Sequence, residues 1–221
     1  MKQIRKGHII SAVLFLLFVI YTLAVKMVDV AAIGPKQSEI GFSTLNMAFF
    51  EAVGTNMTWY HITDWLGKIA LVVAAAFAVL GIVQMIKRKS LLKVDADILL
   101  LGVHYVLVAI FYVFFELVIV NYRPILISGG LEASYPSSHT MLTLCIMVPA
   151  MLQCKQRIQN DILREAAEVV CAAIALVTVI GRLICGVHWL TDILGGILLS
   201  ISLIALYISN VRAAKSHRTE K

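Results

Sequence analysis

Long apolar runs constrain this chain more than any other feature. A helix that crosses a bilayer needs roughly 20 apolar residues. Six runs qualify as candidates, at about residues 8–25, 66–86, 95–120, 138–153, 167–185 and 190–210, of which the fourth is the shortest. The chain is 60% hydrophobic and only 14% charged, which suits a membrane domain better than a soluble globule. We therefore predict an all-α, polytopic membrane protein of six transmembrane helices, with residues 1–221 as a single domain.

The N-terminal run has features of a signal peptide, because Lys2, Arg5 and Lys6 precede its apolar core. Its apolar stretch is long, however, and no clear small-residue cleavage site follows it. The sequence therefore predicts an uncleaved membrane anchor rather than a removed leader.

The net charge of +6 is explained by where the basic residues lie. They form four groups. Lys2, Arg5 and Lys6 precede the first run, and Lys87, Arg88, Lys89 and Lys93 lie between the second and the third. Lys155, Arg157 and Arg164 lie between the fourth and the fifth, and Arg212, Lys215, Arg218 and Lys221 follow the sixth. All four fall on one side of a six-helix topology, which the positive-inside rule makes cytoplasmic. The charge thus predicts orientation, with both termini cytoplasmic, and not a nucleic-acid partner.

Residues 26–64 form the longest connection and lie on the predicted outer side. Apolar side chains between Phe42 and Phe50 predict a short interfacial or re-entrant helix. Aromatic residues around Trp59 suit the headgroup level of a bilayer. Two interpretations remain open for this loop: a plain interfacial belt, or a wall along which a lipid substrate reaches the protein.

The stretch from Gly181 to Asp192 carries Arg182, His188 and Asp192 at the junction of two apolar runs. His188 and Asp192 are four residues apart, so on a helix they share a face, and the carboxylate can hold one ring nitrogen while the other stays free. An oriented histidine beside a fixed arginine can attack a phosphoryl group. The alternative is a chance grouping of polar residues at a membrane interface.

Two further stretches are predicted to lie on the same outer side. One is Asn121-Tyr122-Arg123-Pro124, and the other is Tyr135-Pro136-Ser137-Ser138-His139-Thr140. Ser137 is a plausible N-cap for the helix that follows, and a helix N-terminus suits a phosphate group. Simple helix capping is the alternative role for these serines.

Together the three stretches resemble the signature of the type 2 phosphatidic acid phosphatase (PAP2) superfamily of membrane lipid phosphatases. That pattern is a lysine seven residues before Arg-Pro, then Pro-Ser-Gly-His, then Ser-Arg, five residues, His, three residues and Asp. The order and spacings match, with three departures: Glu116 replaces the lysine, Ser138 the glycine and Gly181 the serine.

The resemblance implies catalytic roles for three residues. His188 attacks phosphorus and forms a phosphohistidine, Asp192 holds the tautomer of His188, and His139 protonates the leaving oxygen and later activates water. We predict no cofactor, and the outer carboxylates of the motifs, Glu116 and Asp192 at most, are too sparse for a two-metal site. The four cysteines lack metal-site spacing and are interpreted as small apolar residues.

The resemblance also implies a phosphate-binding set. Arg123 and Arg182 grip phosphate oxygens, and Ser137, Ser138 and nearby N–H groups complete the contact. Glu116 is the exception, since a carboxylate cannot replace a lysine as a phosphate ligand. It could pair with an arginine, accompany a headgroup with its own cation, or belong to a non-catalytic member of the family.

The predicted function is a lipid phosphatase acting on the outer leaflet, without a metal. Polyprenyl pyrophosphate, phosphatidylglycerol phosphate and phosphatidic acid are substrates in the family, and undecaprenyl pyrophosphate is our first expectation. The same intermediate permits a phosphotransferase that uses another lipid or sugar as acceptor. A catalytically degenerate lipid-binding protein is the hypothesis from another class. The predicted partners are the bilayer and the lipid substrate, and oligomeric state is left open.

Overall fold

The computed structural model describes residues 2–219 of the chain, and the side chains of residues 4–216. Within that part it is all-helical, as predicted, with two isolated β-bridges and no strand. The α-helices are α1 (Lys2–Met27), α2 (Ser43–Val53), α3 (Met57–Arg88), α4 (Ala96–Leu117), α5 (Ser138–Arg157), α6 (Asp161–Ile184) and α7 (Leu190–Thr219), with short 3-10 turns η1 (Pro35–Gln37) and η2 (Leu91–Lys93).

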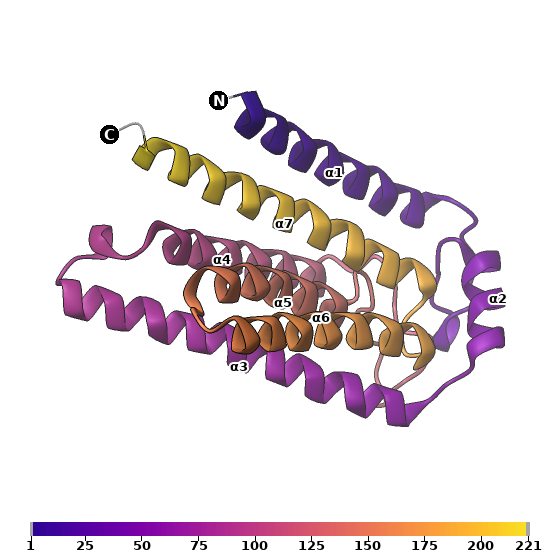
Figure 1. Ribbon diagram of the computed structural model, residues 1–221. Helices are drawn as coiled ribbons and strands as arrows, with labels where there is room; N and C mark the ends of the chain where they lie inside the picture. The colour runs from indigo at the N-terminus through magenta and orange to yellow at the C-terminus, as the bar shows by residue number, and fades with distance from the viewer. Residues whose placement is uncertain (1, 220–221) are drawn as a thin grey trace.

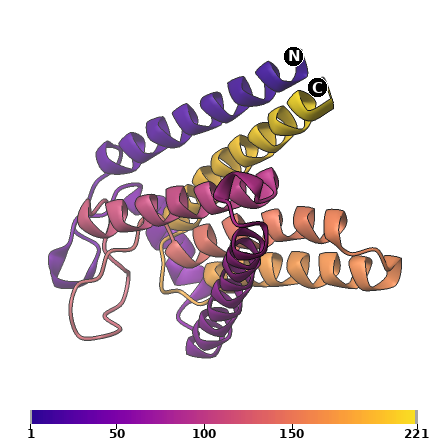
Figure 2. The same ribbon diagram turned by 90° about the vertical axis from the view of Figure 1, so that its left-hand side faces the viewer.

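The long helices lie side by side and alternate in direction (Figure 1). Both termini lie at one end of the bundle, and α2 lies at the opposite end, across the helix tips (Figures 1 and 2). The connections from α3 to α4 and from α5 to α6 return at the end of the termini, so the loops before α3, before α5 and before α7 gather at the α2 end.

Helix α7 is the axis of the bundle, because it contacts α1, α2, α4, α5 and α6. In its most apolar window 61% of the residues are buried, against 11% for α3. Glycines on α7 allow its neighbours to approach: a Cβ on Gly195 would lie 2.5 Å from the Tyr135 ring, and one on Gly196 3.1 Å from the carbonyl oxygen of Ser137. The first turns of α7 are therefore held against the segment that leads into α5.

Five helices of the described chain are long and apolar enough to cross a membrane, namely α1, α3, α4, α6 and α7. Helix α5 is not among them, so the predicted count of six spans stays a prediction. It contacts α3, α4, α6 and α7 and buries polar side chains such as Thr140, Thr143 and Gln153. Because neighbouring helices cover α5, its composition does not need to match lipid.

The second long helix begins earlier than the sequence pattern predicts, at Met57 rather than near residue 66. The Asn56 side chain caps it by accepting a hydrogen bond from the Trp59 N–H. Asp64, the last residue of the predicted connection 26–64, and Lys68 lie one turn apart on it and form an ion pair at 2.9 Å. An i, i+4 charge pair thus fits within the helix without interrupting it.

Helix α2 supplies the short helix predicted in the first outer loop, and it docks on the start of α7. The Asn46 side chain donates to Thr191 Oγ1 at 2.9 Å and accepts from the Thr191 N–H at 3.2 Å. The Phe50 and Trp189 rings pack with centroids 5.7 Å apart. Through these contacts α2 covers the tip of the bundle next to His188.

The opposite end of the bundle is closed by an ion-pair cluster centred on Asp95. Its carboxylate accepts hydrogen bonds from Arg88 at 2.7 Å, from Arg157 at 3.0 Å and from Gln84 at 2.9 Å. Arg157 also pairs with Asp97 at 2.7 Å. The hydrogen bond from Arg88, with those from Arg157 and Gln84, lowers the pKa of Asp95 to about 2. The cluster joins the ends of α3, α4 and α5.

Candidate active site

The three motif stretches converge at the α2 end of the bundle. Arg123 lies in the loop from α4 to α5, His139 in the first turn of α5, and Arg182 in the last turn of α6. His188 precedes α7 and Asp192 lies in its first turn. Helices α5, α6 and α7 thus bring together residues that are far apart in the sequence.

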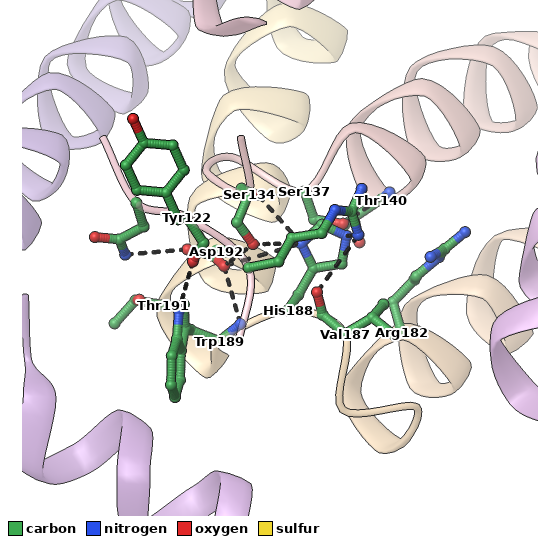
Figure 3. Close-up of polar contacts among 12 residues, drawn as sticks. Tyr122, Ser134, Ser137, Thr140, Arg182, Val187, His188, Trp189, Thr191 and Asp192 are labelled. Carbon is green, nitrogen blue, oxygen red and sulfur yellow. Dashed lines mark hydrogen bonds and ion pairs between the residues drawn. The ribbon is translucent and has the colours of Figure 1, made fainter. Parts of the chain in front are cut away.

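The His188 ring is fixed in one tautomer by its neighbours (Figure 3). Its Nδ1 lies 3.1 Å from the carbonyl oxygen of Ser134 and 2.9 Å from Ser134 Oγ. A carbonyl can only accept, so Nδ1 carries the proton and donates. Arg123 Nη1 lies 3.3 Å from Nε2 and can only donate. The lone pair of His188 therefore sits on Nε2, directed toward Arg123.

Asp192 is fully buried and accepts three hydrogen bonds (Figure 3). Its donors are Ser134 Oγ at 2.5 Å, the Trp189 N–H at 2.9 Å and Asn121 Nδ2 at 3.2 Å. Its nearer oxygen lies 3.9 Å from His188 Nδ1, beyond hydrogen-bond distance. The direct contact expected from the sequence is thus bridged: Ser134 Oγ stands between the carboxylate and the ring.

Burial keeps His188 uncharged. Its side chain is 1% exposed, and the positive charges that act on it come from the Arg123 and Arg182 guanidinium groups and from His139. Burial first, and then these positive neighbours, lower the pKa of His188 well below its ordinary value. At neutral pH the ring is a neutral imidazole, which is the form that can act as a nucleophile.

The two arginines differ in what they contact. Arg123 Nε lies 3.0 Å from a carboxylate oxygen of Glu132, and its Nη1 also reaches the Val187 carbonyl at 3.4 Å. Arg182 is completely buried, and none of its three guanidinium nitrogens has a hydrogen-bond partner among the described residues. Its guanidinium lies 5.1 Å from the centroid of the Tyr60 ring. A buried cation without a partner is costly, so this site is built for an anion.

His139 contacts α3, which the sequence patterns did not connect with the motifs. Its Nε2 lies 3.3 Å from Asp64 Oδ1, and the other Asp64 oxygen pairs with Lys68 at 2.9 Å. The remaining ring nitrogen, Nδ1, is buried and has no hydrogen-bond partner in the described structure. One ring nitrogen is therefore held by Asp64, and the other has no competing protein partner in the described structure.

The start of α5 presents a helix N-terminus to this cluster. Ser137 is its N-cap, as predicted, with Oγ accepting from the Thr140 N–H at 3.5 Å, and its own N–H donates to the Asp192 carbonyl oxygen at 2.9 Å. Ser138 stands where the family pattern has glycine and is the first residue of the helix, with an ordinary negative φ. A side chain at this position requires no left-handed backbone.

Glu116 lies on the last turn of α4 and is exposed. It lines a recess with Ser134, Tyr135 and Ser138, and no ion pair joins it to either arginine in the described structure. The partner of Arg123 is Glu132 instead. Of the possibilities raised by the sequence, a pair between Glu116 and a motif arginine is not what the structure contains.

Gly181 departs from the family pattern because α3 crosses closely at this point. A Cβ there would lie 2.4 Å from Thr63 Cγ2 and 3.0 Å from Trp59 Cε3. A serine would not fit without moving α3. The glycine thus brings α3, and with it Asp64, close to the motif residues.

Sequence reasoning missed Ser134 and Asp64. Ser134 lies three residues before Ser137 in an irregular loop, where no periodicity marks a side chain. Asp64 carried one usable signal: it is a lone carboxylate next to a long apolar run, and such residues usually face the protein interior. Among the described side chains, no group of three or more His, Cys, Asp and Glu is placed to hold a metal ion.

Residues 118–216 match the family model of the PAP2 superfamily. The resemblance to the PAP2 superfamily is thereby confirmed. The matched segment contains Arg123, His139, Arg182, His188 and Asp192, while α1, α2, α3 and α4 precede it. A comparison with curated proteins finds no match.

A likeness to a solved structure extends beyond that segment. The chain is similar to the crystal structure of a transmembrane PAP2-type phosphatidylglycerolphosphate phosphatase from Bacillus subtilis, with a TM-score of 0.62 and 20% sequence identity. The likeness covers 93% of this chain and 96% of that one. At 20% identity the likeness supports a shared fold and nothing further. The shared fold includes helices that lie outside the family match.

Proposed function

We propose that the protein is a membrane lipid phosphatase that removes a terminal phosphate from a lipid phosphate or pyrophosphate through a phosphohistidine on His188. One observation carries the proposal. Arg182 is fully buried, its three guanidinium nitrogens have no hydrogen-bond partner among the described residues, and it lies in the same cluster as a neutral His188 whose Nε2 lone pair faces Arg123 Nη1 at 3.3 Å. The PAP2 match and the phosphatase fold neighbour support the same reaction class.

In the first step, the His188 Nε2 lone pair forms a bond to phosphorus and the bond from phosphorus to the leaving oxygen breaks. His139 gives its proton to that oxygen. Arg123, whose Nη1 faces Nε2 at 3.3 Å, turns its donors to the phosphoryl oxygens together with Arg182. The α5 N-terminus, with Ser137 and Ser138, completes the anion site.

In the second step, water attacks the phosphohistidine. His139 takes the proton of that water, the bond from Nε2 to phosphorus breaks, and inorganic phosphate leaves. The Ser134 carbonyl and the bridge from Ser134 Oγ to Asp192 keep Nδ1 protonated throughout. The positive charge that develops on the ring is thereby stabilised by a buried carboxylate.

The substrate and the membrane face are part of the proposal. The basic groups predict that the termini are cytoplasmic, and the site lies at the other end of the bundle, which supports a site that faces the outer leaflet. Undecaprenyl pyrophosphate and phosphatidylglycerol phosphate are the first substrates to test. The fold neighbour is described as a phosphatidylglycerolphosphate phosphatase, which favours including the second.

The test is phosphate release by purified protein in detergent, with a chelator present. The panel holds undecaprenyl pyrophosphate, phosphatidylglycerol phosphate, phosphatidic acid and a lipid A-type phosphate, and His188→Ala is the control. We expect release that persists in chelator and is lost in the variant, together with an acid-labile phosphoenzyme in the wild type. Release that depends on added metal would overturn the mechanism.

Two other outcomes separate the remaining hypotheses. A phosphorylated lipid or sugar acceptor, in place of free phosphate, would identify a phosphotransferase that uses the same intermediate. Folded protein that binds panel lipids without forming a phosphoenzyme would identify a degenerate, lipid-binding member.

A further inference from the structure

Asp64 is the one acidic side chain of α3, and it lies outside the segment matched by the family model. Its carboxylate has two partners on opposite sides. Oδ1 faces His139 Nε2 at 3.3 Å, and Oδ2 faces Lys68 Nζ at 2.9 Å. The chain of contacts thus runs from an exposed lysine through Asp64 to the ring of the proposed proton donor.

Helix α3 packs closely on α5 where Asp64 contacts His139. Gly67 lies beside the ring, and a Cβ there would be 2.9 Å from His139 Cδ2. Asp64, Gly67 and Lys68 share one helix face, since they are spaced by three and four residues. A glycine at the contact point allows the backbone of α3 to approach closely enough for Asp64 to reach Nε2.

The charges around His139 act in opposite directions on its protonation. Arg182 from α6 and Arg123 from the α4–α5 loop face it with positive charge, and the neutral His188 lies beyond. Positive neighbours and burial disfavour an imidazolium, while a carboxylate favours it. Asp64 is the negative group in contact with the ring.

We propose that Asp64 is a positioning residue for the phosphatase reaction, holding His139 through Nε2 so that Nδ1 delivers a proton to the leaving oxygen. This inference rests on the proposed function. In the protonated ring, Nε2–H donates to Asp64 Oδ1 and Nδ1–H faces the substrate. The Nδ1 proton moves to the leaving oxygen as the bond from phosphorus to oxygen breaks, leaving a neutral imidazole still bound to Asp64. The attacking water returns a proton to Nδ1.

The first test varies the leaving group. An alkoxide needs a proton to depart, whereas a phenoxide needs it much less. We expect Asp64→Asn to lower kcat/KM for octyl phosphate about 10- to 100-fold, within the range for general acid catalysis, and to lower it severalfold less for 4-octylphenyl phosphate. Asp64→Glu should recover part of the loss. Equal losses on both esters would mean that Asp64 acts only on structure.

The second test uses the pH profile on the best panel substrate, with opposite expected shifts. Asp64→Asn removes the charge that favours the protonated ring, so the alkaline limb of kcat/KM moves to lower pH. Lys68→Met removes the cation that offsets the carboxylate, so the limb moves to higher pH. A structural defect would not produce shifts of opposite sign. No shift in either variant would overturn the proposal.

A matched control is Asp161→Asn, which neutralises a 77% exposed carboxylate at the other end of the bundle and should behave as wild type. The outcomes also separate this inference from the proposed function. If wild-type protein forms no phosphoenzyme and releases no phosphate, the proposed function fails. If wild type is active and Asp64→Asn matches it on both esters and in pH profile, only the role of Asp64 fails.

Discussion

Ser134 connects the buried Asp192 carboxylate to His188, the proposed nucleophile. Its hydroxyl donates to Asp192 at 2.5 Å and accepts from His188 Nδ1 at 2.9 Å, while its carbonyl also accepts from Nδ1 at 3.1 Å. The Asp192 carboxylate also accepts a hydrogen bond from the Trp189 N–H, and in this way it caps the N-terminus of α7, in whose first turn it lies. The carboxylate therefore acts on the ring through a hydroxyl rather than directly.

Ser134→Ala should weaken this linkage without abolishing it, because the backbone carbonyl still orients Nδ1. One hydrogen bond contributes about 0.5–1.5 kcal/mol, so we expect kcat to fall about 3- to 10-fold with little change in KM. Asp192→Asn should cost more, since it removes the buried charge. Single-turnover phosphoenzyme formation measures both. A Ser134→Ala rate equal to wild type would show that the bridge is not used.

Glu116 should oppose substrate binding. It lines the recess that contains Ser134 and Ser138, and a carboxylate repels a phosphate dianion there. It is exposed, so water screens much of the interaction. We expect Glu116→Gln to lower KM about 2- to 5-fold at low ionic strength and to lose this advantage in high salt. An increase in KM would instead assign Glu116 to a cationic part of the substrate headgroup.

The sequence predicted the residues of this cluster better than their partners. His188, His139 and the arginines lie in motifs whose spacing can be read along the chain. Ser134 and Asp64 could not be assigned in that way, because their roles depend on contacts between segments 54 and 75 residues apart. Only packing of the helices brings these side chains together.

At the scale of elements, the close approach of α3 to α6 brings Asp64 to the candidate site. Gly181 on α6 faces Thr63 and Trp59, and Asp64 follows Thr63 directly. Sequence patterns predicted the helices because apolar length is a local property. They did not predict the early start of α3, because the i, i+4 ion pair of Asp64 with Lys68 and the Asn56 cap, which make polar residues compatible with this helix, are seen only in three dimensions.

Gly181→Ser, which restores the family residue, should destabilise this protein. The new Cβ would lie 2.4 Å from Thr63 Cγ2, and overpacking costs about 1–3 kcal/mol. We expect a melting temperature in detergent lower by about 2–10 °C. Adding Thr63→Ser removes that methyl group and should recover part of the loss, although Trp59 remains at 3.0 Å. A stable single variant would mean that α3 and α6 are further apart than described.

The Asp95 cluster should make stability depend on acid pH. Arg88, Arg157 and Gln84 hold the folded pKa of Asp95 at about 2, below its usual 3.8. A lowered pKa contributes stability that is complete above the unfolded value and lost as pH falls through the folded one, between about pH 4 and pH 2. Asp95→Asn should lower the melting temperature at pH 7 by about 3–6 °C and flatten its decline in that window. Asp161→Asn, with the exposed carboxylate, is the control and should match wild type in both respects.

At the scale of the whole molecule, the two ends of the bundle differ in charge and in chemistry. The end with the termini carries the Asp95 cluster and the basic connections, and the other end carries α2 and the candidate site (Figure 1). Alternation of helix direction makes this separation a consequence of the order of the elements. The basic side is predicted to face the cytoplasm, since translocating positive charge is unfavourable.

That orientation predicts which loops an impermeant reagent can reach. In an active variant whose four cysteines are replaced by alanine, single cysteines are placed at Gly130, where a Cβ meets open space, and at Leu92, which is 90% exposed. With a charged maleimide on intact cells, we expect labelling at position 130 and not at position 92, and labelling of both after permeabilisation. The reverse pattern would place the site on the cytoplasmic face. The proposed substrate would then be an inner-leaflet lipid phosphate, because position 130 and the candidate site lie in loops and helix ends at the same end of the bundle.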